Sequence, residues 1–530
     1  MLRLAVAAGA AYRAAILAVS RLETLYRTFT AARALLATAL VLCICTPGVA
    51  KLAAIPPSTP DAVTHHTITL DGRSYTYTAR AGTITLRNGS DEPIARVFYT
   101  AYTVDANPSR RPVTFVYNGG PGSSTMWLRM GSFGPVRVAT PSGSISGPPP
   151  YRVVSNRYSL LDRTDLVFID MPGSGFGRIV GAGTRKDLWG VDQDAAAFGQ
   201  FIQRYLTQFG RWNSPRFLFG ESYGTTRSSV LAKYLEDHGV SLNGVVLLSS
   251  FLNSGIDYND GTPVGGGDWA YVLYLPTEAA TAWYHHVIRA PSVESLVSTV
   301  ENFALNEYVE ALAQGAMLAP DRYNDVVAKL HAYTGLSEQY IRNSNLRIPY
   351  DRFQNELLRQ HGVTVGRIDS RFKTYVLDRP EVAPDWDATD AAIDSAFTTS
   401  SNTYLREVLR YNTPLLYRAN IYDLIYADGE TWDFKHGPNP QVLNVTPDLA
   451  EAMTYNPHLR VFSANGYFDF ATPFFATVYA LKHLGLEPAL NRNITYGFYE
   501  SGHMVYLQPQ SLGRFHDDLE RWYAGILTHA

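Results

Sequence analysis

Short, uninterrupted apolar runs recur between residues 113 and 498, and they restrict the fold more than any other feature of this sequence. Such runs suit strands buried on both faces, as in a parallel sheet covered by helices. Between two of them, the apolar residues of 198–206 follow the spacing of one helical face. Alternating strands and helices predict an α/β fold with a mostly parallel central sheet. The runs are 113–117, 166–169, 217–219, 245–248, 459–462 and 494–498.

The segments on either side of these runs predict two additions to the sheet. Residues 65–105 contain short alternating stretches at 67–70, 75–78, 83–86 and 97–99, and Asp71-Gly72 and Asn88-Gly89 provide turn residues. An antiparallel N-terminal extension is therefore expected. Helical periodicity dominates from about 255 to 435, which we interpret as a helical cap inserted into the α/β core. The expected organisation is a signal peptide at 1–50, a tail at 51–64, a core in two parts at 65–254 and 436–530, and the helical cap at 255–435.

Residues 1–50 have the layout of a secretory signal peptide. They hold five arginines and one acid, an apolar stretch at 34–45, and small residues before a cleavage site after Ala50. An uncleaved anchor helix and a transit peptide are the alternatives, although the apolar stretch is short for a span of about 20 residues. Secreted or periplasmic localisation is expected, without stable membrane association once the leader is removed. Cys43 and Cys45, the only cysteines, would leave with it, which excludes a disulfide framework or thiol nucleophile in the mature chain.

The charge and the histidines argue against several function classes. The formal net charge is −3 over 530 residues, which gives no electrostatic basis for binding nucleic acid. The adjacent pairs at 65–66 and 285–286 have no third ligand at metal spacing, so they are interpreted as ordinary surface or loop histidines. No metal and no cofactor is expected.

The pentapeptide at 220–224 holds the candidate nucleophile. Gly220-Glu-Ser222-Tyr-Gly224 matches G-x-S-x-G, an apolar run precedes it, and a helix is predicted at 225–237. This strand–turn–helix setting forces a serine into a sharp elbow and exposes its hydroxyl above the sheet. The alternative is a structural Gly-Ser turn.

A glycine-rich loop at 118–124 directly follows the first apolar run. It has no lysine to meet a phosphate, so an oxyanion loop is a better interpretation than a P-loop. Backbone N–H groups of Gly120 and Tyr223 are the predicted donors to a tetrahedral oxyanion. A simple tight turn is the alternative.

Two further residues complete a predicted Ser-His-Asp arrangement. Asp469 lies just after the run at 459–462, and His503 lies in a loop after the run at 494–498. The order Ser222, Asp469, His503 is the one that α/β hydrolases use. His503 is expected to accept the Ser222 proton and return it to the leaving group, while Asp469 fixes the imidazole tautomer.

Together these residues resemble the serine carboxypeptidase family of the α/β hydrolases. The resemblance covers roughly residues 65–525, and the segments around 111–135, 274–277, 346–348 and 366–371 are similar to the bacterial branch. The resemblance implies removal of C-terminal residues from peptides through an acyl-enzyme on Ser222. It also implies a subsite for the substrate carboxylate. The motifs are Asn118-Gly-Gly-Pro-Gly-Ser-Ser124, Gly220-Glu-Ser-Tyr-Gly224, Asn465-Gly466 with Asp469, and Gly502-His503-Met504.

The positions that match the family's carboxylate subsite are Asn118, the Gly119 amide and Glu221. Glu221 would have to be protonated to donate a hydrogen bond to a carboxylate, because two close anions repel each other. This sequence also departs from the family. A second glutamate, a Trp and a Cys of many relatives are replaced by Ser132, Val116 and Ser123 respectively, so the predicted subsite has fewer polar groups.

The same predicted active-site residues are compatible with three classes of function. A secreted serine carboxypeptidase acting on peptides is the leading hypothesis. An esterase or acyltransferase is the second, because water, an amine or an alcohol can capture an acyl-enzyme. A non-catalytic binding protein on a hydrolase scaffold is the third, and the presence of Ser222, Asp469 and His503 disfavours it.

Overall fold

The computed structural model describes residues 58–104, 110–259, 262–263, 267–378, 380–426 and 432–528. The chain divides into two units, 1–55 and 56–530, and only the second contains described residues. The predicted signal peptide and residues 51–57 of the predicted tail lie outside the described ranges. Within those ranges, no helix combines the length and apolar character needed to cross a bilayer.

Ten strands of the described chain form one mixed sheet, which confirms the predicted α/β fold with a mostly parallel centre. The order is β1-β2-β3-β7-β4-β9-β10-β15-β16, with β8 paired to β3. The pairs from β7 to β16 are parallel, and those that join β1, β2, β3 and β7 are antiparallel. The strands are β1 (Ala62–Leu70), β2 (Arg73–Arg87), β3 (Pro93–Val104), β4 (Val113–Tyr117), β7 (Asp165–Ile169), β8 (Arg178–Ile179), β9 (Arg216–Ser222), β10 (Gly244–Ser250), β15 (Arg460–Gly466) and β16 (Ile494–Tyr499).

The antiparallel edge differs from the sequence prediction in one respect. The stretches 75–78 and 83–86 belong to one long strand, β2, rather than to two. Ala81 and Gly82 continue the ladder, opposite Thr100 and Tyr99 of β3. A paired neighbour therefore carries the strand through residues that look like a break in isolation.

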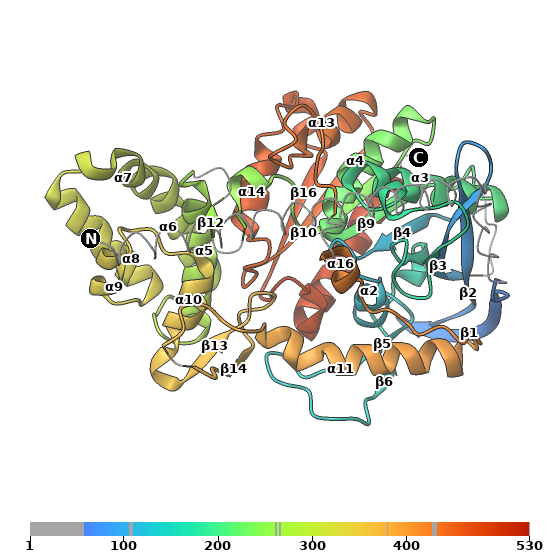
Figure 1. Ribbon diagram of the computed structural model, residues 1–530, viewed down its shortest axis with the longest axis horizontal. Helices are drawn as coiled ribbons and strands as arrows, with labels where there is room; N and C mark the ends of the chain where they lie inside the picture. The colour runs from blue at the N-terminus through green and yellow to red at the C-terminus, as the bar shows by residue number, and fades with distance from the viewer. Residues whose placement is uncertain are drawn as a thin grey trace, which may run out of the picture. The chain divides into compact units, whose positions relative to one another are not determined.

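Helices cover both faces of the sheet (Figure 1), and alternate strand residues contribute to two apolar clusters. On β4, for example, Phe115 belongs to one cluster and Val116 to the other. The first cluster is covered by α3 (Val191–Gln208), α4 (Tyr223–Asp237), α13 (Thr446–Tyr455) and the end of α14 (Phe474–Lys482). The second is covered by α2 (Met126–Gly131), α11 (Ala388–Thr403) and α16 (Pro509–Leu527).

The helical stretch between β10 and β15 packs in two parts. Helices α5 to α10 form a separate apolar cluster with Phe468 and Phe474, whereas Phe397 of α11 packs against Trp127 of α2 and belongs to the second cluster. The bounds 255–435 for a cap remain a prediction. The helices are α5 (Trp269–Tyr284), α6 (Val293–Phe303), α7 (Val309–Gln314), α8 (Pro320–Thr334), α9 (Glu338–Asn343), α10 (Tyr350–Leu357), α11 and α12 (Tyr422–Tyr426), and the short strand pairs are β11 (Tyr258–Asn259) with β12 (Thr262–Pro263) and β13 (Val363–Val365) with β14 (Lys373–Tyr375).

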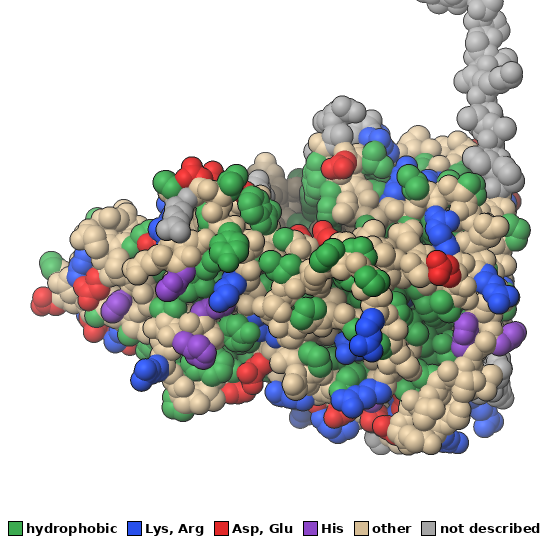
Figure 2. Space-filling view, turned by 90° about the horizontal axis from the view of Figure 1, so that it is seen from below, with side chains coloured by type: hydrophobic (Ala, Val, Ile, Leu, Met, Phe, Trp, Pro, Cys, Tyr) green, Lys and Arg blue, Asp and Glu red, His purple; other side chains and the backbone are tan. Residues whose placement is uncertain are grey.

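The face seen in Figure 2 carries basic and acidic side chains interspersed among apolar ones. No single sign of charge gathers over this face. That distribution agrees with the near-zero net charge of the sequence.

Candidate active site

A pocket of about 590 Å³ brings the predicted site residues together. Its walls come from the ends of β4 and β9, from the segment between β10 and α5, and from the helical insertion. Asp469 does not line it and lies behind His503, fully buried. The predicted residues that do line it are Asn118, Gly119, Gly120, Glu221, Ser222, Tyr223 and His503.

Ser222 occupies a sharp elbow between β9 and α4. Its backbone has φ +62° and ψ −132°, a conformation that a non-glycine residue adopts only at a cost of about 1–3 kcal/mol. Neighbouring glycines make the turn feasible: a Cβ on Gly220 would lie 2.2 Å from the Gly224 carbonyl oxygen. The elbow presents Ser222 at the pocket wall, as the G-x-S-x-G motif predicts.

His503 and Asp469 are joined by a direct hydrogen bond. The distance from His503 Nδ1 to Asp469 Oδ2 is 2.9 Å. Asp469 also accepts hydrogen bonds from the Ala471 and Thr472 amides, at 2.8 and 2.9 Å, and from the Thr472 hydroxyl at 2.8 Å. Burial alone would lower the pKa of His503, but the adjacent carboxylate raises that pKa above its ordinary value. The pair is therefore built to accept a proton on the imidazole.

The loop after β4 packs closely against the elbow. A Cβ on Gly119 would lie 2.4 Å from the Tyr223 amide nitrogen, so only glycine permits this approach. Gly120 has φ +109° and also lines the pocket. The structure thus places the two predicted oxyanion donors, Gly120 and Tyr223, in the same wall as Ser222.

Glu221 is buried beside Ser222 and bonded to a tyrosine that the sequence analysis did not identify. The Tyr506 hydroxyl donates to both carboxylate oxygens, at 3.0 and 3.2 Å. Burial raises the pKa of Glu221 to about 7, against the opposing effects of His503 and of hydrogen bonds from Tyr506 and Asn118. Near neutral pH the Glu221 carboxyl is therefore present in two forms, a neutral form that can donate a hydrogen bond and an ionised form that cannot.

The three departures from the family pattern have separate locations. The Ser132 hydroxyl donates to the Leu128 carbonyl at 2.6 Å and does not line the pocket. Val116 is buried in β4, and Ser123 lines the pocket. The position of the family's second glutamate is therefore occupied by Ser132, which is not acidic.

A buried ion pair connects the helix after the elbow to the neighbouring helix α3 and to the loop after β4. Arg227 of α4 meets Asp194 of α3 at 2.6 Å, with both side chains fully buried. The same guanidinium donates to the Asn118 carbonyl at 2.8 Å. Arg227 therefore links the helix after Ser222 to the loop that carries Asn118.

Removing the acid of this pair is expected to destabilise the protein. Asp194→Asn would leave Arg227 buried without a counter-charge, which typically costs about 3–5 kcal/mol of unfolding free energy. Urea unfolding measures the loss. The matched control is Asp237→Asn, which breaks the exposed pair with Lys233 and should change stability by about 0.5 kcal/mol or less. Equal losses in the two variants would contradict a structural role for the buried pair.

Several groups of the site carry no sequence signal. Thr472 contacts both members of the His503–Asp469 pair, with its hydroxyl 3.0 Å from His503 Nδ1 and 2.8 Å from Asp469 Oδ2. Tyr350 and Arg367 reach the pocket from the insertion. Arg367 belongs to the segment 366–371 that is similar to the bacterial branch, but that resemblance assigned no role to its side chain.

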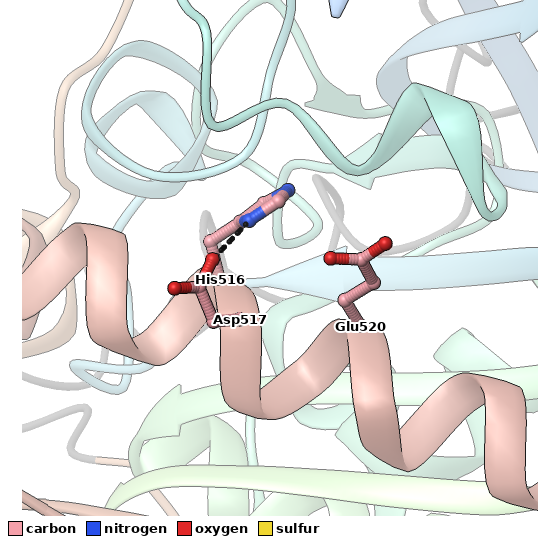
Figure 3. A group of neighbouring side chains, drawn as sticks. All are labelled: His516, Asp517 and Glu520. Atoms are coloured by element: carbon pink, nitrogen blue, oxygen red, sulfur yellow. Dashed lines mark hydrogen bonds and ion pairs between the residues drawn. The ribbon is translucent and has the colours of Figure 1, made fainter. Parts of the chain in front are cut away.

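One group of potential metal ligands lies elsewhere among the described residues. Figure 3 shows His516, Asp517 and Glu520 on α16, with His516 Nδ1 3.2 Å from the Asp517 carboxylate. Glu520 forms an ion pair with Arg163. The carboxylates of this group have explanations without a metal.

The sheet topology, the strained serine elbow and the His–Asp pair define an α/β hydrolase. The model of the serine carboxypeptidase family matches residues 77–497, so this chain belongs to that family. The relatives described below come from plants and yeast, and membership of the bacterial branch remains a prediction.

Individual relatives are distant. Serine carboxypeptidase-like 35 of Arabidopsis thaliana is 23% identical over 412 residues, covering 75% of this chain and 74% of that protein. Serine carboxypeptidase-like 45 of the same plant is 28% identical over 178 residues, which span 32% of this chain and 36% of the relative. The solved structure of Kex1(Δ)p, a prohormone-processing carboxypeptidase from Saccharomyces cerevisiae, has a TM-score of 0.45 at 17% identity and covers 82% of this chain and 89% of that one.

Proposed function

We propose that this chain is a serine carboxypeptidase that hydrolyses the C-terminal peptide bond through an acyl-enzyme on Ser222. The observation that carries the proposal is the buried Glu221 next to the nucleophile, beside Asn118 in one pocket. A neutral Glu221 can donate a hydrogen bond to a terminal carboxylate and so select the end of a chain. Family membership supports the reaction class.

The proposed chemistry uses groups already present in the pocket. His503 takes the Ser222 proton as Oγ attacks the scissile carbonyl, and the Gly120 and Tyr223 amides hold the oxyanion. The amine leaves with the proton from His503, which gives the acyl-enzyme and a free amino acid. Water then attacks, its proton passes to His503 and on to Ser222 Oγ, and the shortened peptide is released. Asp469 stabilises the imidazolium in both halves.

The proposed carboxylate subsite consists of Asn118, Gly119 and Glu221. The test compares a blocked dipeptide that has a free C-terminus with the same dipeptide as its C-terminal amide. Cleavage of the free acid, and much slower cleavage of the amide, is the expected result. Equal rates on both substrates would contradict the carboxypeptidase proposal and favour an esterase or a less selective hydrolase.

Replacing Glu221 should change the pH dependence of this reaction. Below pH about 7 the neutral carboxyl donates to the substrate carboxylate, and above it the anion repels the substrate. The wild-type kcat/KM for free-acid peptides is therefore expected to fall as pH rises above about 7. Glu221→Gln, whose amide donates at every pH, should lose this alkaline decline.

The acidic limb of the same profile provides an internal control. It reports loss of the neutral imidazole as His503 is protonated, so it should persist in Glu221→Gln. Profiles of kcat/KM against pH for both proteins give the comparison. Superimposable profiles would show that Glu221 does not govern carboxylate binding.

We also propose export through the N-terminal leader, with cleavage after Ala50. The mature enzyme would then contain no cysteine, because Cys43 and Cys45 both precede the site. Packing and buried pairs such as Arg227–Asp194 would have to stabilise it without disulfides.

A further inference from the structure

Arg367 is fixed in the pocket wall by the two loops that carry the candidate acid–base pair. It lies between β13 and β14 and lines the pocket with Ser222. The amide of Phe470, next to Asp469, donates to the Arg367 carbonyl at 3.0 Å, and the His503 amide donates to the next carbonyl, of Ile368, at 2.7 Å. The backbone at Arg367 is thus tied to the residues of the proposed chemistry.

The side chain of Arg367 is exposed in this pocket and rests against an aromatic ring. Its guanidinium carbon lies 6.0 Å from the ring centroid of Tyr350, the first residue of α10. Such a cation–π contact, together with a side-chain hydrogen bond between Tyr350 and the arginine, restricts the guanidinium. Across the described chain, no acid lies within 4.0 Å of this guanidinium in an ion pair.

The acids nearest to Arg367 have other hydrogen-bond donors. Asp257 accepts a hydrogen bond from the Tyr274 hydroxyl. Asp387 accepts one from the Ile368 amide at 3.0 Å. The Arg367 backbone amide also donates to Asp387, but neither acid forms an ion pair with the Arg367 guanidinium. The guanidinium N–H groups that do not bond Tyr350 therefore remain available to a ligand.

Two further acids line the same pocket at the start of α11. Burial raises the pKa of Asp390 to about 7 and that of Asp394 to about 6. Asp390 is therefore only partly ionised near neutral pH. Its partial negative charge therefore attracts the Arg367 guanidinium only weakly, compared with a fully ionised substrate carboxylate.

We propose that Arg367 binds a carboxylate of the peptide substrate and that Tyr350 holds the guanidinium in position. A charged fork of N–H donors in a pocket matches a carboxylate better than any other group of a peptide. The carboxylate belongs either to an acidic side chain of the residue before the cleaved bond or to the C-terminus, in which case Arg367 adds to the proposed subsite of Asn118, Gly119 and Glu221. This inference rests on the proposed carboxypeptidase function, to which it adds a selectivity among peptides.

The test measures binding without turnover. Four blocked peptides carry Glu or Gln before the last residue, each as a C-terminal acid or amide. Calorimetric Kd values are compared between Ser222→Ala and Ser222→Ala/Arg367→Gln. We expect at least a tenfold loss of either the Glu-over-Gln preference or the acid-over-amide preference, because a hydrogen-bonded charge pair is removed. Which preference falls identifies the carboxylate.

Two controls separate this role from a structural one. Arg367→Lys keeps the charge but not the fork, so it should restore part of the lost preference. Arg352→Gln removes an exposed arginine two residues beyond Tyr350 that does not line the pocket, and both preferences should stay unchanged. An equal weakening of all four peptides by Arg367→Gln, or no change at all, would overturn the proposal.

A separate measurement tests the proposed function on which this inference rests. With Ser222 intact, the wild-type protein should cleave the Gln peptide acid whether or not Arg367 discriminates among peptides. Failure of that cleavage would refute the carboxypeptidase proposal, whereas the Kd comparison alone decides the role of Arg367.

Discussion

Ser222→Ala is expected to lower kcat for a free-acid peptide by about 10⁶-fold, the scale seen when a hydrolase loses its serine nucleophile. The strained elbow carries this hydroxyl, and residues 58–528 contain no cysteine that could replace it. Folding should be retained, because the strain lies in the backbone and alanine removes one oxygen only. Initial rates at equal protein concentration measure the change, and the melting temperature checks the fold.

Covalent labelling identifies the nucleophile directly. A fluorophosphonate should modify wild-type protein with one label and should leave Ser222→Ala unmodified. The matched control is Ser241→Ala, an exposed serine between α4 and β10 that does not line the pocket, and its labelling should equal that of wild type. Persistent labelling of Ser222→Ala would assign the chemistry to another residue.

The parts of the fold that were predictable are those whose residues face one environment throughout. The run at 113–117 is buried at every position and coincides with β4. The helix after Ser222 begins at Tyr223, two residues earlier than predicted, because the elbow passes directly into α4. Continuous burial and a sharp turn each produce a recognisable pattern in the local sequence.

Features that depend on a distant partner were not predictable. The continuity of β2 depends on pairing with β3 through Ala81 and Gly82. Within the stretch of predicted helical periodicity, a π-helical segment at Ala304–Tyr308 separates α6 from α7, and Tyr308 donates to the Leu346 carbonyl at 2.6 Å. In each case a long-range contact overrides the local preference of the chain.

The same distinction applies to the site. Glycine spacing marks the elbow and the loop after β4, because both need backbone approaches that a Cβ would block. Thr472, Tyr506 and Arg367 contribute side chains whose partners lie on other segments, and nothing in their local sequence reveals this. Sequence motifs therefore identified the candidate reacting groups, whereas their side-chain partners became visible only in the structure.

Asp469→Asn is expected to lower kcat by about 10⁴-fold while the melting temperature stays close to that of wild type. An amide of the same shape can donate to His503 Nδ1, which favours the tautomer that cannot accept the Ser222 proton, and it does not stabilise the imidazolium. The loss should appear in kcat more than in KM, because the interaction strengthens as charge develops. Single-turnover and steady-state rates separate the two parameters.

Thr472→Val provides the matched comparison, because it removes the bridging hydroxyl and leaves the carboxylate. Asp469 would keep its bonds to His503 and to the amides of residues 471 and 472, at 2.8–2.9 Å, so we expect a loss of about tenfold or less, equal to one hydrogen bond. Losses of similar size in both variants would mean that the orientation of the imidazole, and not the charge of Asp469, sets the rate. A 10³-fold gap between them would assign the larger share to the carboxylate.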